Sequence, residues 1–286
     1  MARASIRIGI SGWRYGPWRG KFYPKDLRQK DELAFVAEKF SSIEINGTFY
    51  SLQSASSFRA WRDATPPEFI FALKGPRFIT HIKRLRGVEI PLANFFASGV
   101  LALGQKLGPV LWQLPPSFRF DRDRLTAFFS LLPRTTGQAT RLAKRHDMKL
   151  RHRAVLRSDQ DRPIRHALEI RHDTFRDPAF INLLRRHNIA LVVADTVEWP
   201  LLMDVTADFV YVRLHGSEKL YASGYSDEAL DAWADRIRAW KGGREAHGEH
   251  AGSPASRCRR DVYVYFDNDA KVRAPFDALA LKKKLM

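Results

Sequence analysis

The chain has little cysteine and no long apolar run. Cys258 is the single cysteine among 286 residues, which excludes an internal disulfide and a zinc site built from several thiolates. The Gly-, Ser- and Arg-rich stretch around it is typical of an incidental surface thiol. No apolar segment approaches the roughly 20 residues that cross a bilayer, and no signal-like segment precedes the first strand-like run. We therefore expect a cytoplasmic protein without a membrane partner.

Motifs of the common cofactor sites are also missing. Gly9, Gly12 and Gly16 do not have the spacing of a dinucleotide-binding loop. There is no Walker loop, no His-Glu-x-x-His and no Gly-x-Ser-x-Gly nucleophile elbow. The sequence thus makes no cofactor evident, and a divalent metal enters below only as one of several hypotheses.

Acidic residues are fewer than basic ones. The chain has 48 Lys and Arg against 31 Asp and Glu, a formal net charge of +17. Such an excess favours anionic partners, whether nucleic acid, phosphorylated metabolites or an acidic surface. It fits equally well a basic protein whose charge only aids solubility. With 45% hydrophobic residues, the chain is long enough to bury one large core or two small ones.

Short β-rich runs alternate with helical periodicity along the whole chain. Helical spacing is clearest at 33–40, 180–187 and 230–240, the last opened by Ser226 as N-cap. The strand-like runs are Ile6–Ser11, Ser42–Asn46, Phe69–Lys74, Val110–Leu114, Ala167–Arg171, Ala190–Ala194, Phe209–Leu214 and Val262–Phe266. Eight such units predict a single α/β domain over 1–286, a (β/α)₈ TIM-like barrel. A doubly wound open sheet is the main alternative.

Two connections in this scheme are long. Residues 134–165 contain a helix-like stretch dense in Arg and Lys. Residues 241–260 are rich in Gly, Arg and His with little apolar content, which predicts a mobile loop before the last strand. Neither stretch resembles a separate domain.

Polar pairs interrupt several of the strands at a spacing of i, i+2. They are Glu44 and Asn46, Glu169 and Arg171, Arg213 and His215, and Tyr265 and Asp267. This spacing points both members to one side of the strand. Buried charges are costly, so these groups must pair with one another or with a ligand.

Seven motifs occur in order along the chain: Ile-Gly-Ile-Ser-Gly-Trp (8–13), Glu-Ile-Asn-Gly-Thr-Phe-Tyr (44–50), Lys-Gly-Pro-Arg-Phe-Ile-Thr-His (74–81), Gln-Leu-Pro-Pro (113–116), Glu-Ile-Arg-His (169–172), Tyr-Val-Arg-Leu-His-Gly (211–216) and Tyr-Phe-Asp-Asn-Asp (265–269). With them the chain resembles the DUF72 (YecE-like) family over nearly its full length. The resemblance implies a TIM-like barrel and leaves the activity open, because the family is a domain of unknown function. Gly47 stands where Ser is commoner, and Gly75 where Ala is commoner.

In a barrel of this kind the functional face lies at the C-terminal ends of the strands. We assign candidate catalytic roles to His215, Glu169 and Asp267. Candidate ligand-binding residues are Trp13, Glu44, Asn46, Lys74, Arg77, Gln113, Arg171, Asp195, Arg213 and Asn268. The competing interpretation is an internal lattice of ion pairs that fixes strand register.

Three chemistries fit this set to different degrees. The favoured one is binding of a small anionic, phosphorylated ligand by Lys74, Arg77, Arg171 and Arg213, with His215 as acid or base. A metal-dependent, phosphodiester-acting enzyme would use the ligands Glu44, Glu169, Asp195, His215 and Asp267, but the neighbouring cations count against it. A glycosidase is less favoured, because strands 4 and 7 end in Gln113 and His215 instead of carboxylates.

Two non-enzymatic alternatives remain. A nucleic-acid-binding protein would use the basic stretch 141–165, the cluster Arg77, His81, Lys83, Arg84 and Arg86, and loop aromatics that stack bases: Trp13, Trp18, Phe22, Tyr23, Phe49 and Tyr50. The same aromatics fit a packed core or lid. A barrel that binds a ligand without chemistry is the other alternative. The loop 12–18 is either a lid over the barrel mouth or a permanent plug, and the sequence leaves the oligomeric state open.

Overall fold

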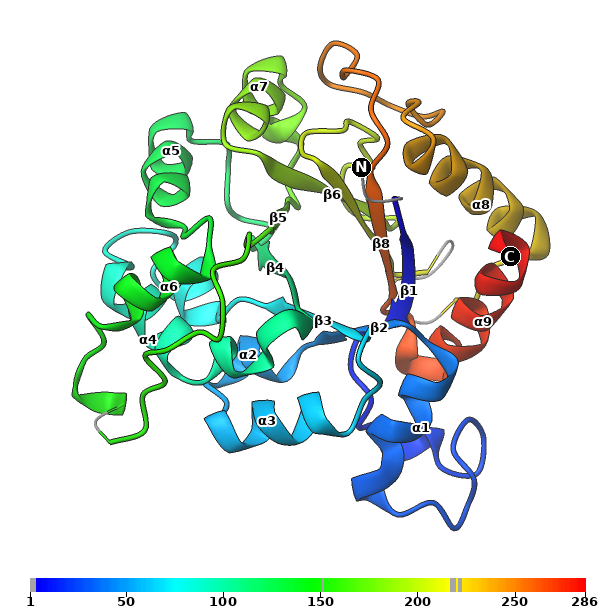
Figure 1. Ribbon diagram of the computed structural model, residues 1–286. Helices are drawn as coiled ribbons and strands as arrows, with labels where there is room; N and C mark the ends of the chain where they lie inside the picture. The colour runs from blue at the N-terminus through cyan, green and yellow to red at the C-terminus, as the bar shows by residue number, and fades with distance from the viewer. Residues whose placement is uncertain (1–3, 151, 217–219, 221–222) are drawn as a thin grey trace.

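Eight parallel strands form one closed sheet in the computed structural model, which describes residues 4–150, 152–216, 220 and 223–286. Their order is β1-β8-β7-β6-β5-β4-β3-β2. The strands are β1 (Ile6–Ile10), β2 (Ser42–Ile45), β3 (Ile70–Lys74), β4 (Leu107–Gln113), β5 (His166–Glu169), β6 (Ile189–Asp195), β7 (Phe209–Leu214) and β8 (Asp261–Phe266). Helices surround them (Figure 1). The predicted (β/α)₈ barrel is confirmed, and the doubly wound open sheet is wrong.

The barrel closes where β1 meets β2. A single bridge joins Ser11 to Glu44, and the Gly12 amide donates to the Glu44 carbonyl at 2.8 Å. Gly9 makes this approach possible, because a Cβ at its position would lie 2.0 Å from the carbonyl oxygen of Ser42. The closing seam is therefore short and depends on one glycine.

Five of the nine α-helices within the described residues begin at a side-chain N-cap. The hydroxyl of Ser226 accepts from the Ala229 amide at 3.2 Å, as predicted, and Asp177 caps a helix that opens with Pro178. The helices are α1 (Glu32–Lys39), α2 (Gly47–Tyr50), α3 (Ala55–Asp63), α4 (Glu89–Ala97), α5 (Arg122–Leu131), α6 (Thr136–Ala143), α7 (Pro178–Arg186), α8 (Asp227–Lys241) and α9 (Ala274–Leu285). The β6–β7 connection, 196–208, is described throughout and contains no helix.

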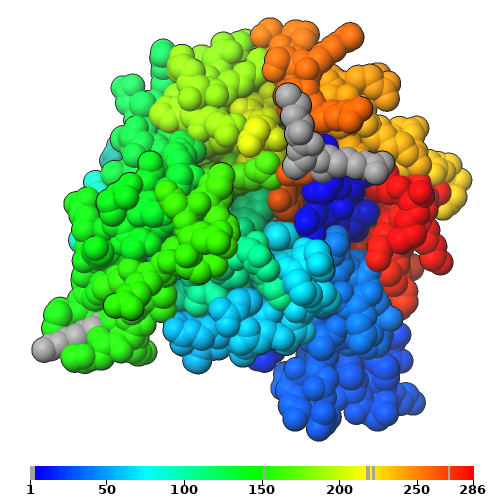
Figure 2. Space-filling model, viewed as in Figure 1, coloured from blue at the N-terminus to red at the C-terminus, as the bar shows by residue number. Residues whose placement is uncertain are grey.

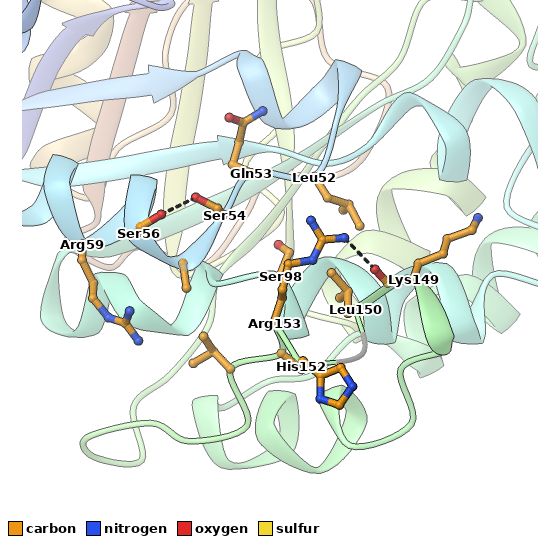
Figure 3. A pocket seen from close by; sticks show the side chains of 13 residues that line it. Leu52, Gln53, Ser54, Ser56, Arg59, Ser98, Lys149, Leu150, His152 and Arg153 are labelled. Carbon is orange, nitrogen blue, oxygen red and sulfur yellow. Dashed lines mark hydrogen bonds between the residues drawn. The ribbon is translucent and has the colours of Figure 1, made fainter.

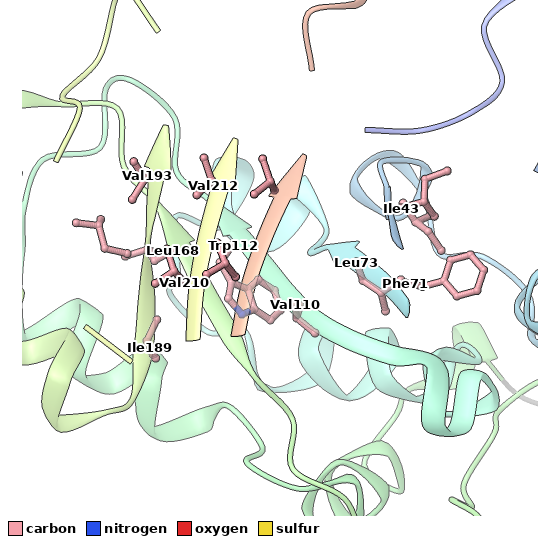
Figure 4. Packing of buried hydrophobic residues seen from close by; sticks show 14 of the residues in the cluster. Ile43, Phe71, Leu73, Val110, Trp112, Leu168, Ile189, Val193, Val210 and Val212 are labelled. Carbon is pink, nitrogen blue, oxygen red and sulfur yellow. The ribbon is translucent and has the colours of Figure 1, made fainter. Parts of the chain in front are cut away.

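Two apolar layers hold the barrel together. The outer layer packs between strands and helices, and Figure 4 shows members of it such as Ile43, Trp112 and Val193. The inner layer fills the barrel and alternates with the outer one along each strand. Its members are Ala72, Leu111, Ala167, Ala190, Val192, Ala194, Phe209, Tyr211, Tyr263 and Tyr265. Small residues on β3, β5 and β6 leave room for the large rings of β7 and β8.

The two long connections are largely irregular in structure. In the first, α6 is followed by a segment that runs along the outside of the barrel beside α3 (Figures 1 and 2). In the second, the amide of Met203 donates to Glu249 at 2.7 Å, and the carboxylate of Asp204 accepts from Ala251 and Gly252. These hydrogen bonds tie the loop before β8 to the β6–β7 connection. Its predicted mobility stays a prediction.

We expect Gly9→Ala to destabilise the fold by about 1–3 kcal/mol, because its Cβ would collide with the Ser42 carbonyl. Gly16→Ala is the matched control, since a Cβ there meets no atom within 4 Å. Urea unfolding followed by circular dichroism measures both. Equal stability of the two variants would contradict the closing role of Gly9.

Candidate functional site

Four charged side chains from four strands converge inside the upper barrel. The Arg213 guanidinium (β7) binds Glu169 (β5) at 2.7 Å, Glu44 (β2) at 2.9 Å and Asp267, just after β8, at 2.7 Å. These are members of the polar pairs that the i, i+2 spacing places on the inner side of the barrel. Their convergence confirms that part of the sequence interpretation.

Burial makes this pairing obligatory. Arg213, Glu44 and Glu169 are all 0% exposed, so each charge has lost its water and needs a protein partner. Burial acts to raise the pKa of Glu169, but Arg213 and Arg171 outweigh it and hold the pKa well below the usual range. Burial likewise opposes ionisation of Asp267, yet Arg213 and His215 lower its pKa to about 2. Both carboxylates are therefore charged at neutral pH.

Neutral hydroxyls complete the shell of Glu44. Ser11 donates to its Oε1 at 2.8 Å and Tyr211 to its Oε2 at 2.6 Å. One layer below, the Tyr265 hydroxyl lies 2.6 Å from that of Ser42. Tyr211 therefore fixes Glu44 from below, and Tyr211 and Tyr265 lie directly beneath the polar layer.

His215 lies beside two of the carboxylates. Its Nδ1 is 3.3 Å from Asp267 Oδ2, and its Nε2 is 3.8 Å from Glu169 Oε2. The edge-to-face contact with Trp199, at 5.8 Å between ring centroids, holds the imidazole from the side. The imidazole therefore lies between two carboxylates, which can orient its ring.

Arg171 and Lys74 bring the remaining positive charge of the layer. Arg171 binds Glu169 at 2.7 Å and stacks over Trp199 at 3.7 Å. Lys74, at the end of β3, lies over the Phe49 ring at 4.4 Å. The Lys74 ammonium donates no hydrogen bond to any residue in the described part of the chain. Burial, then Arg213, lower the pKa of Lys74 to about 8.

A positive rim lies over the β3 sector. The His81 ring contacts Phe49 at 5.1 Å, on the same aromatic ring as Lys74. Burial, then Arg171, Lys74 and Arg77, lower the pKa of His81 to about 4. This imidazole is therefore neutral at pH 7 and lies among three cations, of which Arg77 is exposed.

The structure places the other predicted residues at the margin of this layer. Trp13 and Asn46 line a cavity of about 260 Å³ at the edge of the mouth, where Trp13 packs against Trp61. Gln113 Oε1 is buried and accepts from no described residue. Asp195 accepts from the Trp233 indole at 3.1 Å, and burial raises its pKa.

Asn268 points away from the centre. Its amide donates to Asp277 at 2.8 Å and to the Ser223 carbonyl at 3.0 Å, so it holds the turn after β8 against α9. This geometry supports the turn, and its predicted ligand contact stays a prediction.

Most of the loop aromatics are packed. Trp13, Trp18, Phe22, Tyr23 and Phe49 are all buried, and only Tyr50 of the six is exposed. The packed interpretation of these rings is therefore correct for five of them. That the loop 12–18 is either a lid over the barrel mouth or a permanent plug stays a prediction.

The predicted site did not include three residues that contact the polar layer or lie beside it: Tyr211, Trp199 and Asp269. Tyr211 lies two residues before Arg213, and the same alternation would have found it. Trp199 lies on the β6–β7 connection, where no pattern marks it. Burial and then Asp267 raise the pKa of Asp269 to about 8, so this carboxyl is largely protonated at neutral pH.

Residues 4–150, 152–216, 220 and 223–286 contain no group of three or more His, Cys, Asp or Glu side chains arranged to hold a metal ion. Of the carboxylates that the metal hypothesis needs, Glu44, Glu169 and Asp267 are directed at Arg213, and Asp195 accepts from Trp233. Across the same described residues, no helix has the length and apolar character required to span a bilayer.

We expect Arg213→Met to destabilise the fold by about 3–5 kcal/mol, because it leaves the buried Glu44 without an ion-pair partner and removes one cation from Glu169 and Asp267. Without Arg213 the carboxylate pKa values rise. The deficit relative to wild type should then shrink as the pH falls from 7 toward 4.

The control is Arg28→Met, which removes an exposed ion pair with Asp31 and should cost less than about 1 kcal/mol. Adding Glu44→Gln and Glu169→Gln to Arg213→Met should recover part of the loss. Denaturant unfolding at pH 4 and pH 7 measures all variants, and a deficit independent of pH would argue against the ion-pair interpretation.

Comparison with known proteins identifies a family, relatives in sequence and relatives in fold. A family model described as "Protein of unknown function DUF72" matches residues 7–286. The UPF0759 protein YecE of Escherichia coli K12 is 22% identical over 240 residues, 82% of each chain. The UPF0759 protein YunF of Bacillus subtilis is 31% identical over 128 residues, 42% of this chain and 43% of that one.

Two solved structures have the same fold. A DUF72 family protein of Thermotoga maritima superposes with a TM-score of 0.72 at 24% identity, covering 98% of this chain and 99% of the other. One from Enterococcus faecalis gives a TM-score of 0.70 at 17% identity, covering 98% and 95%. At these identities the likeness shows the fold alone.

Proposed function

Because the chain belongs to the DUF72 family, a family of unknown function, we propose a function from its own geometry: the C-terminal face of the barrel binds a small anionic, phosphorylated ligand. The observation that carries this proposal is the Lys74 ammonium. It lies at the end of a barrel strand with no hydrogen-bond acceptor among the described residues, and its charge acts on His81 together with those of Arg171 and Arg77.

The charges of the layer are paired by direct contact except at Lys74. Glu44, Glu169 and Asp267 make ion pairs with Arg213 and Arg171, three carboxylates against two guanidiniums. Lys74 is the third cation of the layer and makes no direct ion pair within the part of the chain that the structure describes, and the exposed Arg77 adds a further positive charge. A phosphate there would gain charge-assisted hydrogen bonds from both cations.

Arg213 has a supporting role in this proposal. Its guanidinium is 0% exposed, and both of its terminal nitrogens bind carboxylates. It therefore positions Glu169 and Asp267 and does not contact the ligand. Arg171, which stacks on Trp199 at the top of the layer, is better placed for a phosphate.

His215 is the group we assign to proton transfer, with Asp267 and Glu169 orienting its ring. A ligand-binding barrel without chemistry is the alternative. Turnover of a phosphate ester that is lost in His215→Asn, with binding retained, would favour an enzyme.

Lys74→Met should lower affinity for ribose 5-phosphate about 10- to 100-fold, because a charged hydrogen bond is lost, and should leave the weak binding of ribose unchanged. Lys83→Met, an exposed lysine on the same loop, is the control and should bind as wild type does. Isothermal titration calorimetry measures both. Equal affinity of wild type and Lys74→Met would contradict the proposal.

The affinity should also depend on pH. With a pKa of about 8 in the free protein, Lys74 is charged below pH 8 and neutral above it. Binding of ribose 5-phosphate should therefore weaken as the pH rises from 7 to 9. The decline should be absent in Lys74→Met, and an identical profile in both proteins would show that another group is responsible.

A further inference from the structure

A basic track runs along the outside of the barrel to its mouth. We give this name to three cavities that share lining residues. The first, about 590 Å³, lies between Arg62 and Arg157. The second, also about 590 Å³, shares Arg59 and Val155 with the first. The third, about 270 Å³, shares Leu52 and Lys149 with the second.

The two walls of the track both contribute cations. The exposed side chain of Arg59 comes from α3, and Lys149, His152 and Arg153 come from the facing segment (Figure 3). The acids in the lining are engaged already. Asp159 binds Arg162 at 2.5 Å, and Asp147 accepts from the Lys149 amide at 2.9 Å. The track therefore presents an excess of positive charge to a ligand.

The mouth end of the track has exposed aromatic rings. Tyr50 is 71% exposed and Phe78 is 45% exposed, and both line the third cavity with Arg77. Phe49 lines the same cavity, and its ring contacts Lys74 and His81. The third cavity and the site of the proposed function therefore share Phe49.

We propose that the basic track binds a single-stranded nucleic acid, whose terminal phosphate reaches Lys74. Cations spaced along a groove suit successive phosphates, and exposed rings suit the faces of unstacked bases. A duplex keeps its base faces covered, and a peptide does not repeat an anion and a flat ring in every unit as a single strand does. The contact with Lys74 rests on the proposed function, whereas binding along the track does not.

The test is fluorescence anisotropy of the full chain with labelled oligothymidylate of 12 nucleotides between 50 and 200 mM salt. Arg59→Gln/Arg157→Gln should lower affinity about tenfold or more and reduce the magnitude of the log–log salt slope by about 1.4, because two phosphate contacts are lost. Arg257→Gln/Lys283→Gln removes two exposed charges elsewhere and should bind within twofold of wild type.

A stacking variant separates nucleic acid from other polyanions. Tyr50→Ala/Phe78→Ala should weaken oligothymidylate binding fivefold or more and leave binding of inorganic polyphosphate unchanged. Equal loss for both probes would overturn the assignment to nucleic acid. So would tighter binding of a 12-base-pair duplex, or an unchanged affinity of the Arg59→Gln/Arg157→Gln variant.

The Lys74 contact is measured separately. A 5′-phosphate or a 3′-phosphate should tighten oligonucleotide binding, and the gain should vanish in Lys74→Met. If neither phosphate changes the affinity, the strand end does not reach Lys74. That part of the proposal is then wrong, and binding along the basic track is unaffected. If ribose 5-phosphate fails to bind wild type but the oligonucleotide binds through Arg59 and Arg157, the proposed function fails and the track does not.

Discussion

The contact of one guanidinium with three carboxylates is the constraint on which the rest of the molecule depends. Arg213 lies at the level where β2, β5, β7 and β8 end, and it links them through side chains. A shift of any of these strands by one residue would exchange a charged group for an apolar neighbour such as Ile45 or Leu214. The cost of burying unpaired charge therefore sets the register of half of the barrel.

The same constraint shapes the interior below. The side chains below a guanidinium and three carboxylates must be large enough to exclude water and able to donate hydrogen bonds. Tyr211 and Tyr265 meet both requirements, with ring centroids 5.2 Å apart. They fit because Ala72 on β3, Ala167 on β5 and Ala190 on β6 are small. The polar layer and the unequal sizes of the inner residues are thus two aspects of one packing solution.

The fold and the central site were predictable from local pattern to different extents. All eight strands were found, because each is a short β-rich run and most are separated by a stretch of helical periodicity. The convergence of Glu44, Glu169, Arg213 and Asp267 followed from the i, i+2 spacing of the polar pairs together with parallel topology. The partners within the layer did not follow, because the sequence says which side a residue faces and not which neighbour it touches.

Arg213 and Arg171 looked equivalent in the sequence, yet Arg213 is enclosed by acids and Arg171 stacks on Trp199. Trp199 is a loop residue that no periodicity marks. Asn268 shares a motif with Asp267 but faces the last helix.

The single-bridge seam between β1 and β2 has a consequence for how the chain folds. The first strand pairs along its full length with the last, Ile6 opposite Val262, so the barrel closes only when both ends of the chain are present. Glu44 from the first half finds its cation in the second half. A half-barrel made of β1 to β4 would bury Glu44 and Lys74 without Arg213, Glu169 or Asp267. Such an intermediate is electrostatically unsatisfied, because Glu44 and its cation Arg213 are 169 residues apart in the sequence. This favours cooperative assembly of the whole barrel over stepwise addition of halves.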